Sequence, residues 1–263
     1  MNKITKEGVQ KEIDRFCIRE HDLNIYVFDE LGSTNQWIRD RLENDQIMLC
    51  VTNVQTAGRG REGRTWISPD GGIYLSFNYR VRPEQCDFAA ISLIIGLVLV
   101  RVLRSEGVKN VSVKWPNDIL INDSKLAGIL IEAKKLNDSL QLVIGVGLNV
   151  HVSDRSVIPA DINWSDLSDQ CLGLSDRERL IALILCESKK VIPEFLKAGF
   201  GVFRDEWMDY DAYAGKEVKV LDQGKVVLSG VESGVDENGL LQVLSGGELL
   251  KVYSGDVSLR LNS

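Results

Sequence analysis

The sequence has few of the residues from which metal sites and disulfide frameworks are built. Its 263 residues include two histidines and five cysteines, and no two cysteines form a CxxC pair. The cysteines are Cys17, Cys50, Cys86, Cys171 and Cys186. Zinc sites require cysteine or histidine ligands at short, regular spacing, so no structural zinc site is expected. We expect the cysteines to be unpaired, which favours a cytoplasmic location because disulfides are rare there.

Long apolar runs and an excess of positive charge are also missing. The longest uncharged apolar run, Phe88–Val100, has 13 residues, whereas a helix needs about 20 to cross a bilayer. The N-terminus alternates charged and apolar residues and lacks the apolar core of a signal peptide. The net charge of -7 provides no general attraction to the phosphates of nucleic acids. We therefore expect neither a membrane partner nor a broad nucleic-acid surface.

The hydrophobic content and the strand-like segments of the sequence predict one large α+β unit followed by a small β unit. With 44% hydrophobic and 26% charged residues, the chain can bury one large core and a smaller second one. Segments rich in branched and aromatic residues predict the strands of a mostly antiparallel or mixed sheet. They are Ile25–Phe28, Ile47–Val54, Ile73–Tyr79, Val111–Trp115, Ile119–Ile121, Ala127–Glu132 and Leu140–Val150. From Lys216 onward, short alternating strands between glycine-containing turns predict a β-barrel of about 50 residues.

Helical patterns flank these strands. The segments are Met1–Arg19, Ser33–Asn44, Phe88–Arg104 and Ser175–Ala198. Ser33 or Thr34 can cap the second segment. The third is expected to be a buried core helix that ends at Gly107, because glycine readily terminates a helix. Pro193 is expected to kink or end the fourth, because proline cannot donate a helical hydrogen bond.

The loop Gly58–Arg64, GRGREGR, has the strongest chemical character in the chain. It matches the GxGxxG pattern of dinucleotide-binding folds, and a strand precedes it. That fold requires a helix directly after the glycines, but Pro69, Gly71 and Gly72 exclude a long one. The Walker pattern is also absent, because no lysine followed by serine or threonine closes the glycine run.

Three arginines of the loop, Arg59, Arg61 and Arg64, suit an anionic ligand. Their planar guanidinium groups match carboxylate and phosphate oxygens and keep their charge. Taken alone, the loop is equally compatible with a solvated basic turn or a short nucleic-acid patch.

Four further motifs give the loop a context. They are STN at Ser33–Asn35, KWPND at Lys114–Asp118, KLAGILIE at Lys125–Glu132 and GVGLNV at Gly145–Val150. Together with QTAGRGR at Gln55–Arg61, their order and separation closely resemble the biotin protein ligase family, from about Phe28 to the C-terminus.

The resemblance implies an α+β fold like that of class II aminoacyl-tRNA synthetases. A mixed or antiparallel central sheet with flanking helices would be followed by a small SH3-like C-terminal β-barrel. The implied divisions are an N-terminal helical extension at 1–22, a biotin- and ATP-binding catalytic domain at 23–212 and the C-terminal domain at 213–263.

The resemblance also implies the activity. Such a ligase forms biotinyl-5'-AMP from biotin and ATP. It then transfers biotin to a lysine of a biotin carboxyl carrier protein domain of acetyl-CoA carboxylase or a related carboxylase. Magnesium would accompany ATP without a metal site fixed by the protein, and Asp118 would either contact Mg²⁺ or assist the incoming amine. Both steps build negative charge on oxygen, so the site chiefly needs fixed positive charge.

The family motifs assign roles to individual residues. Catalytic candidates are Lys125, Arg59, Arg61 and Asp118. Biotin-binding candidates are Ser33, Thr34, Asn35, Gln55, Gly58, Arg59, Gly60, Arg61, Lys125 and Gly128. Candidates for ATP or the adenylate are Arg59, Arg61, Arg64, Trp66, Asn117, Asn149 and Trp164. The arginines would order over the adenylate as a lid.

Simpler structural roles compete with several of these assignments. Lys114 and Asp118 have the alternative of an ordinary ion pair. Ser33 and Thr34 have the alternative of acting only as helix caps. Tryptophans such as Trp164 are more often core residues than ligand contacts.

Two further expectations concern partners. Relatives that act as repressors have an N-terminal winged helix-turn-helix of about three helices and a hairpin. Only some 20 residues precede the predicted core here, so DNA binding is not expected. Edge strands of the central sheet are available for side-by-side pairing into a homodimer.

Two alternative functions differ from biotin ligation. A lipoate or octanoate ligase would need a longer, more uniformly apolar tunnel, against which the polar STN motif and Gln55 argue. A non-enzymatic module that binds RNA or an acidic partner would leave Lys125 and the KWPND turn unexplained.

Overall fold

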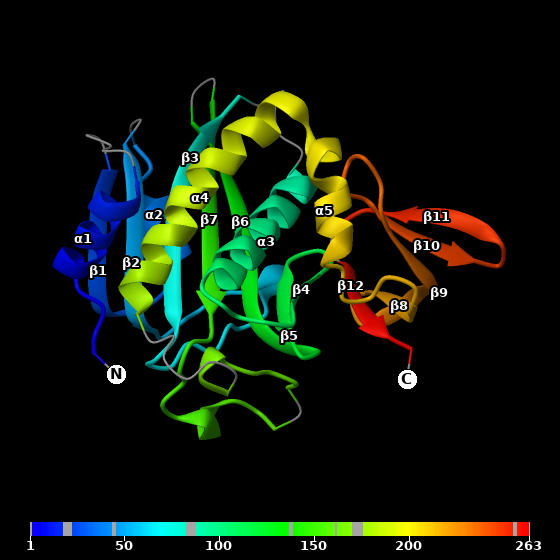
Figure 1. Cartoon of the computed structure of the whole chain (residues 1–263), viewed down its shortest axis with the longest axis horizontal. Helices are drawn as coiled ribbons and strands as arrows, with labels where there is room; N and C mark the ends of the chain where they lie inside the picture. The colour runs from blue at the N-terminus through cyan, green and yellow to red at the C-terminus, as the bar shows by residue number, and fades with distance from the viewer. Residues whose placement is uncertain are drawn as a thin grey trace.

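The computed structural model describes residues 2–17, 23–43, 46–82, 88–136, 139–160, 162–169, 176–254 and 257–262. These residues form a seven-stranded mixed sheet covered by helices and a five-stranded antiparallel sheet at the C-terminus (Figure 1). The predicted α+β class, with a mixed central sheet and a small C-terminal β unit, is therefore confirmed.

The central sheet has the strand order β1-β2-β3-β7-β6-β5-β4. β1 and β2 are parallel, and all other neighbours are antiparallel. The strands are β1 (Leu23–Leu31), β2 (Ile47–Gln55), β3 (Ile73–Val81), β4 (Val111–Lys114), β5 (Asp118–Ile121), β6 (Ser124–Leu136) and β7 (Ser139–Leu148). Each predicted segment overlaps one of these strands. β6 extends past the predicted end at Glu132, because its pairing with β7 continues until Leu136 lies opposite Ser139.

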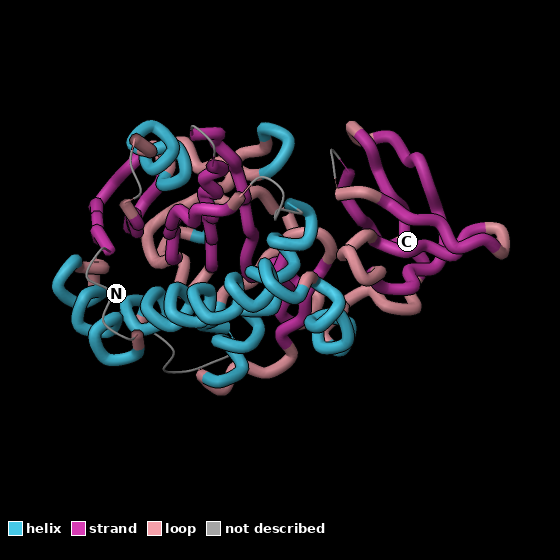
Figure 2. The backbone as a smooth tube through the Cα atoms, turned by 90° about the horizontal axis from the view of Figure 1, so that it is seen from above, coloured by secondary structure: helices cyan, strands magenta, loops and turns pink. Residues whose placement is uncertain are grey.

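Helices cover both faces of this sheet. α1 (Lys6–Phe16), α3 (Phe88–Ser105) and α4 (Arg177–Ala198) lie along one face, whereas α2 (Thr34–Arg41) lies on the other (Figures 1 and 2). Alternate side chains of a strand point to opposite faces. Leu49 of β2 accordingly packs in the main core, and the adjacent Cys50 packs in the smaller core beneath α2.

Two helix predictions have different outcomes. α3 is the expected core helix, and Gly107 follows it with a φ of 88°. Pro193 was expected to kink or end α4. The helix continues through it to Ala198, so the proline does not end the helix, and the expected kink stays a prediction. One backbone hydrogen bond is lost there, but Ile192 and Phe195 remain buried against the core and hold the helix. The predicted start at Ser175 lies outside the described residues.

The C-terminal sheet has the order β11-β10-β9-β8-β12. Its strands are β8 (Glu217–Asp222), β9 (Lys225–Val235), β10 (Leu241–Ser245), β11 (Glu248–Val252) and β12 (Val257–Leu261). It follows α5 (Arg204–Asp209). Short 3-10 helices are η1 (Arg61–Gly63), η3 (Arg155–Val157), η4 (Leu167–Asp169) and η5 (Phe200–Phe203).

The two sheets are joined along β4. The N–H of Val113 donates to the carbonyl oxygen of Tyr210 at 2.8 Å, and the N–H of Ala212 donates to the carbonyl oxygen of Val113 at 2.8 Å. The indole Nε1 of the buried Trp115 donates to the carbonyl oxygen of Gly239 at 3.1 Å. The segment that leads into the C-terminal unit is therefore bonded to β4, and the unit itself is held through the Trp115 side chain. Figure 2 shows its strands beside the helix-covered sheet.

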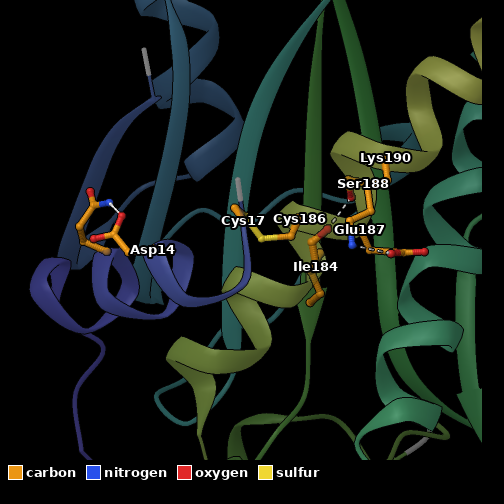
Figure 3. Close-up of a disulfide and its surroundings, with 8 residues drawn as sticks. Asp14, Cys17, Ile184, Cys186, Glu187, Ser188 and Lys190 are labelled. Atoms are coloured by element: carbon orange, nitrogen blue, oxygen red, sulfur yellow. Dashed lines mark hydrogen bonds and ion pairs between the residues drawn. A yellow bond between two sulfur atoms is a disulfide. The ribbon is translucent and has the colours of Figure 1, made fainter. Parts of the chain in front are cut away.

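Cys17 and Cys186 form a disulfide between the end of α1 and the middle of α4 (Figure 3). Their Cα atoms are 5.4 Å apart, although 169 residues separate them in the sequence. The expectation of unpaired cysteines is therefore wrong for these two, because the packing of α1 on α4 brings them together and spacing alone could not show it. Cys50 is a buried free thiol, and Cys86 and Cys171 lie outside the described residues.

Within the described ranges, no helix has both the length and the apolar character needed to cross a membrane.

Candidate active site

A cavity of about 550 Å³ opens between the central sheet, the arginine loop and the C-terminal unit. Its walls are the start of α2, the loop at 59–66, the turn at 114–118, the facing parts of β6 and β7, and residues 257–260. Motifs that are far apart in the sequence therefore face one space.

The positive charge of the cavity is concentrated in a cluster of two lysines that share one carboxylate. Lys114 ends β4 and Asp118 begins β5, so the KWPND segment is the turn of a hairpin. Lys125 lies on the adjacent strand β6. Its Nζ is 2.6 Å from Asp118 Oδ1, and Nζ of Lys114 is 3.3 Å from Asp118 Oδ2. The predicted alternative of a Lys114–Asp118 pair is thus present, but the same carboxylate also fixes Lys125.

Electrostatics keep this cluster charged. Burial acts to raise the pKa of Asp118, but the attraction of Lys125 and Lys114 outweighs it and holds that pKa below its usual range. Burial lowers the pKa of Lys114 more than the nearby Asp118 raises it. One carboxylate between two ammonium groups leaves the cluster with net positive charge, which suits anionic ligands.

The arginine loop is a tight hairpin. Arg59 pairs with Thr65 in an antiparallel bridge, and the N–H of Gly60 donates to the carbonyl oxygen of Arg64 at 2.7 Å. Glu62 and Gly63 turn the chain with φ values of 57° and 70°. Within the described residues 64–82, no long helix follows the loop. A dinucleotide-binding fold would need one there, so the structure agrees with its exclusion.

The loop contacts both parts of the molecule. Nη1 of Arg61 donates to Asn117 Oδ1 at 3.3 Å, and its Nη2 donates to the carbonyl oxygen of Ser254. Arg64 pairs with Glu62 within the loop itself. The loop is thereby attached to the KWPND turn and to the C-terminal unit at once.

A polar pocket lies at the start of α2. Ser33 caps the helix by accepting from the N–H of Gln36, so its predicted capping role is confirmed. The N–H of Thr34 donates to Gln55 Oε1 at 3.0 Å, and Ser76 Oγ donates to Asn35 Oδ1 at 2.6 Å. Donors and acceptors are therefore fixed within a largely buried pocket.

Glycines of β6 and β7 make room for the side chains of this pocket. A Cβ on Gly147 would lie 2.4 Å from Trp66 Nε1, and one on Gly145 would lie 2.1 Å from Asn35 Oδ1. Trp66 lines the cavity, and its buried Nε1 has no hydrogen-bond partner in the described part of the chain. This indole N–H therefore lies against the backbone of β7, in the space that the absent Gly147 side chain leaves.

Most of the predicted site residues line this single cavity. They are Ser33, Thr34, Asn35, Gln55, Arg59, Gly60, Arg61, Arg64, Trp66, Asn117, Asp118, Lys125 and Gly128. Three others lie outside its lining, and their ligand roles stay predictions. Gly58 shapes the loop, Asn149 donates from Nδ2 to the carbonyl oxygen of Ser165 at 3.1 Å, and Trp164 lies against the guanidinium of Arg155.

The sequence interpretation missed the contribution of the C-terminal unit. Tyr213 and residues 257–260 line the cavity, as does Asp123. No motif marks these residues. Tyr213 and residues 257–260 reach the site only through the docking of one sheet on the other, whereas Asp123 lies in the turn between β5 and β6. The aromatic ring of Tyr213 has its centroid 5.7 Å from Lys114 Nζ, close enough for a cation–π contact.

The described residues bring together no group of three or more histidine, cysteine, aspartate or glutamate side chains that would hold a metal ion. Asp118 does not fit the role of a resident magnesium ligand, because both of its oxygens contact lysine ammonium groups.

Comparisons with known proteins agree with this arrangement. Residues 28–149 match the model of the Biotin/lipoate A/B protein ligase family, and residues 213–260 match that of the Biotin protein ligase C terminal domain. The chain is 34% identical over 240 residues to the Bifunctional ligase/repressor BirA of Escherichia coli (strain K12), covering 90% of this chain and 74% of that protein.

Two further proteins extend the comparison. The chain is 32% identical over 241 residues to the Biotin--[acetyl-CoA-carboxylase] ligase of Mycobacterium tuberculosis, covering 88% of this chain and 87% of that protein. It is similar in structure to the biotin protein ligase from Aquifex aeolicus solved in complex with biotin and ATP. That match has a TM-score of 0.76 and 28% identity, and it covers 91% of this chain and 99% of the other.

Proposed function

The chain belongs to the biotin protein ligase family, and from this we propose that its cavity joins biotin to ATP as biotinyl-5'-AMP and passes biotin to a lysine of a biotin carboxyl carrier protein domain. The observation that supports this most directly is the Lys114–Asp118–Lys125 cluster, which faces the arginine loop across one cavity.

In the first step, an oxygen of the biotin carboxylate bonds to the α-phosphorus of ATP, and the bond to pyrophosphate breaks. Two anions must approach each other, so the step needs fixed positive charge. Lys125 supplies it beside the reacting atoms, and Arg59 and Arg61 supply it from the loop. Because Asp118 holds Lys125 at 2.6 Å, the ammonium group is oriented before the substrates arrive.

In the second step, the neutral amine of the acceptor lysine bonds to the acyl carbon, AMP leaves with the electron pair of the broken bond, and the nitrogen releases its extra proton to water or to the departing phosphate. Asp118 is a weak base here, since two lysines hold its pKa below the usual range. We assign to it the positioning of Lys125, in preference to proton removal or magnesium binding.

The polar pocket suits the ureido ring of biotin, which presents one carbonyl acceptor and two N–H donors. Asn35 and its neighbours offer neutral groups of both kinds, beside the apolar wall of Leu75 and Val146. A lipoate ligase would gain nothing from these polar groups. The match of residues 213–260 to the biotin ligase C-terminal domain also favours biotin.

The acceptor and the setting complete the proposal. We assign the carrier domain of acetyl-CoA carboxylase as the acceptor and Mg²⁺ as the companion of ATP. We keep the cytoplasm as the proposed location, although the Cys17–Cys186 disulfide removes the argument from unpaired cysteines. A homodimer would use β1, because segment 210–212 already covers the edge of the sheet at β4.

The test uses the full chain with ATP, Mg²⁺, a carrier domain and either biotin or lipoate. Pyrophosphate release and the mass of the carrier are measured. Biotin should be attached and lipoate should not. Lys125→Ala should lose adenylate formation by about a hundredfold or more while staying folded, whereas Lys135→Ala, an exposed lysine on the same strand, should match the wild type. Turnover with lipoate alone, or none with an intact carrier, would contradict the proposal.

A further inference from the structure

Glu132 lies on β6 where the arginine loop meets the polar pocket, outside the residues that line the cavity. We propose that Glu132 is a positioning residue that holds the lid arginine Arg59 and the pocket amide Asn35 in one network, and so couples biotin binding to retention of the adenylate. The inference rests on the proposed function and adds to it a residue to which the family motifs assigned no task.

One carboxylate serves three donors. Glu132 Oε2 accepts from Arg59 Nη2 and, at 3.0 Å, from Asn35 Nδ2. Its Oε1 accepts from Arg39 Nη1 at 3.0 Å. The Glu132 side chain is only 17% exposed, so these ionic hydrogen bonds are less screened than pairs at the surface.

The ion pair with Glu132 fixes the Nη2 atom of Arg59 but does not use its Nε atom. A guanidinium is a rigid planar fork, so holding Nη2 sets the direction of the other N–H groups. The Nε atom of Arg59 is buried and has no hydrogen-bond partner among the described residues. A buried donor without a partner is costly. An oxygen of a bound carboxylate or phosphate would satisfy it, while Glu132 keeps the plane of the group in place.

The same carboxylate sets the orientation of Asn35. Glu132 can only accept hydrogen bonds, so the NH₂ group of Asn35 must face it. The amide oxygen then faces Ser76, which donates to it at 2.6 Å. Thr34 continues the chain, with its Oγ1 2.7 Å from Ser76 Oγ and its N–H 3.0 Å from Gln55 Oε1.

The network therefore runs without a break from the lid to the polar pocket. A ligand that fits the ureido pocket stabilises Asn35 in the orientation that Glu132 requires. An ordered Glu132 in turn holds Arg59 over the reacting groups. Loss of Glu132 should affect retention of the adenylate and the KM for biotin more than the KM for ATP.

The experiment compares Glu132→Gln with the wild type in the full chain. Adenylate is formed from biotin and Mg-ATP without acceptor, and its dissociation is followed by rapid desalting. Glutamine keeps the size of the side chain and removes its charge. We expect dissociation about tenfold faster and a raised KM for biotin, with the thermal unfolding midpoint still showing a folded protein.

A double-variant cycle tests whether Glu132 acts through Arg59. Arg59→Ala combined with Glu132→Gln should release adenylate no faster than Arg59→Ala alone, because the two changes remove one shared interaction. The exposed Glu30→Gln on β1 is the control, and it is expected to retain adenylate as the wild type does.

Three outcomes would overturn the inference: unchanged retention in Glu132→Gln, tighter retention, or additive effects in the double variant. Tighter retention would mean that Glu132 competes with the ligand for Arg59. A wild-type protein that forms no adenylate would instead contradict the proposed function, so the two failures are distinguishable.

Discussion

Asp118 is the residue on which the charges of the cavity converge, since it lies between Lys114 and Lys125 and is itself largely buried. Lys114 is also buried, with 8% of its surface exposed. Removing the carboxylate would leave a buried ammonium group without its counter-ion. Such a change is more costly than losing a surface pair.

We expect Asp118→Asn to lower kcat/KM for biotinylation by about a hundredfold, because Lys125 loses its anchor. The free energy of unfolding should fall by about 3 kcal/mol, measured by urea denaturation. Asp29→Asn, which breaks the exposed pair with Lys3, should change neither quantity appreciably. Full activity in Asp118→Asn would contradict the positioning role.

Glu232 is a second buried acid, and it lies next to Asp211 at the junction of the two sheets. Burial, with the nearby Asp211 adding to it, raises the pKa of Glu232 from 4.5 to about 10. Between these values the folded protein keeps a proton that the unfolded chain releases. Rising pH therefore favours the unfolded chain over this range.

We accordingly expect the free energy of unfolding to fall as the pH is raised from 6 to 9, and Glu232→Gln to flatten this dependence and to stabilise the protein at pH 8. Urea denaturation at several pH values checks both. The exposed Glu248→Gln on β11 is the control and should behave like the wild type. Equal slopes in wild type and Glu232→Gln would refute the role of this carboxyl group.

At the scale of elements, α1 is attached to the rest of the molecule by a covalent bond as well as by packing. The Cys17–Cys186 disulfide joins it to α4, and Glu178 of α4 accepts from the N–H of Thr5 at 2.7 Å. The bond closes a loop across most of the chain, which lowers the entropy of the unfolded state.

We expect reduction with dithiothreitol to lower the free energy of unfolding by up to about 4 kcal/mol, measured by urea denaturation with and without reductant. Cys17→Ser should show the lower value under both conditions. Mass spectrometry after alkylation provides the check, because labelling of both Cys17 and Cys186 in unreduced, denatured protein would show that the bond is absent.

The elements themselves were largely predictable, for a physical reason. Strands and helices follow from local alternation and spacing, and α3 was evident from its apolar run and from Gly107. The passage of α4 through Pro193 was not, because burial of Ile192 and Phe195 outweighs the local cost of the proline. The Cys17–Cys186 contact likewise depends on how two helices pack.

At the scale of the whole molecule, the motif residues were predictable as a set because each motif is a short local segment. Their convergence on one cavity, and the shared use of Asp118 by two lysines, required the sheet to be assembled. Residues 257–260 and Glu132 illustrate the limit. Glu132 ends the KLAGILIE motif, but its contacts with Arg39, Arg59 and Asn35 come from distant parts of the sequence. No local pattern marks residues 257–260 at all.

The attachment of Arg61 to both Asn117 and the carbonyl oxygen of Ser254 has a consequence for how such proteins can be recombined. The C-terminal unit is one wall of the reaction chamber, so it is not an interchangeable module. In a chimera that takes residues 213–263 from a relative, the arginine loop of this chain would meet a C-terminal unit with different contact residues. Its two halves could each be well folded and still release the adenylate into solvent before the acceptor arrives.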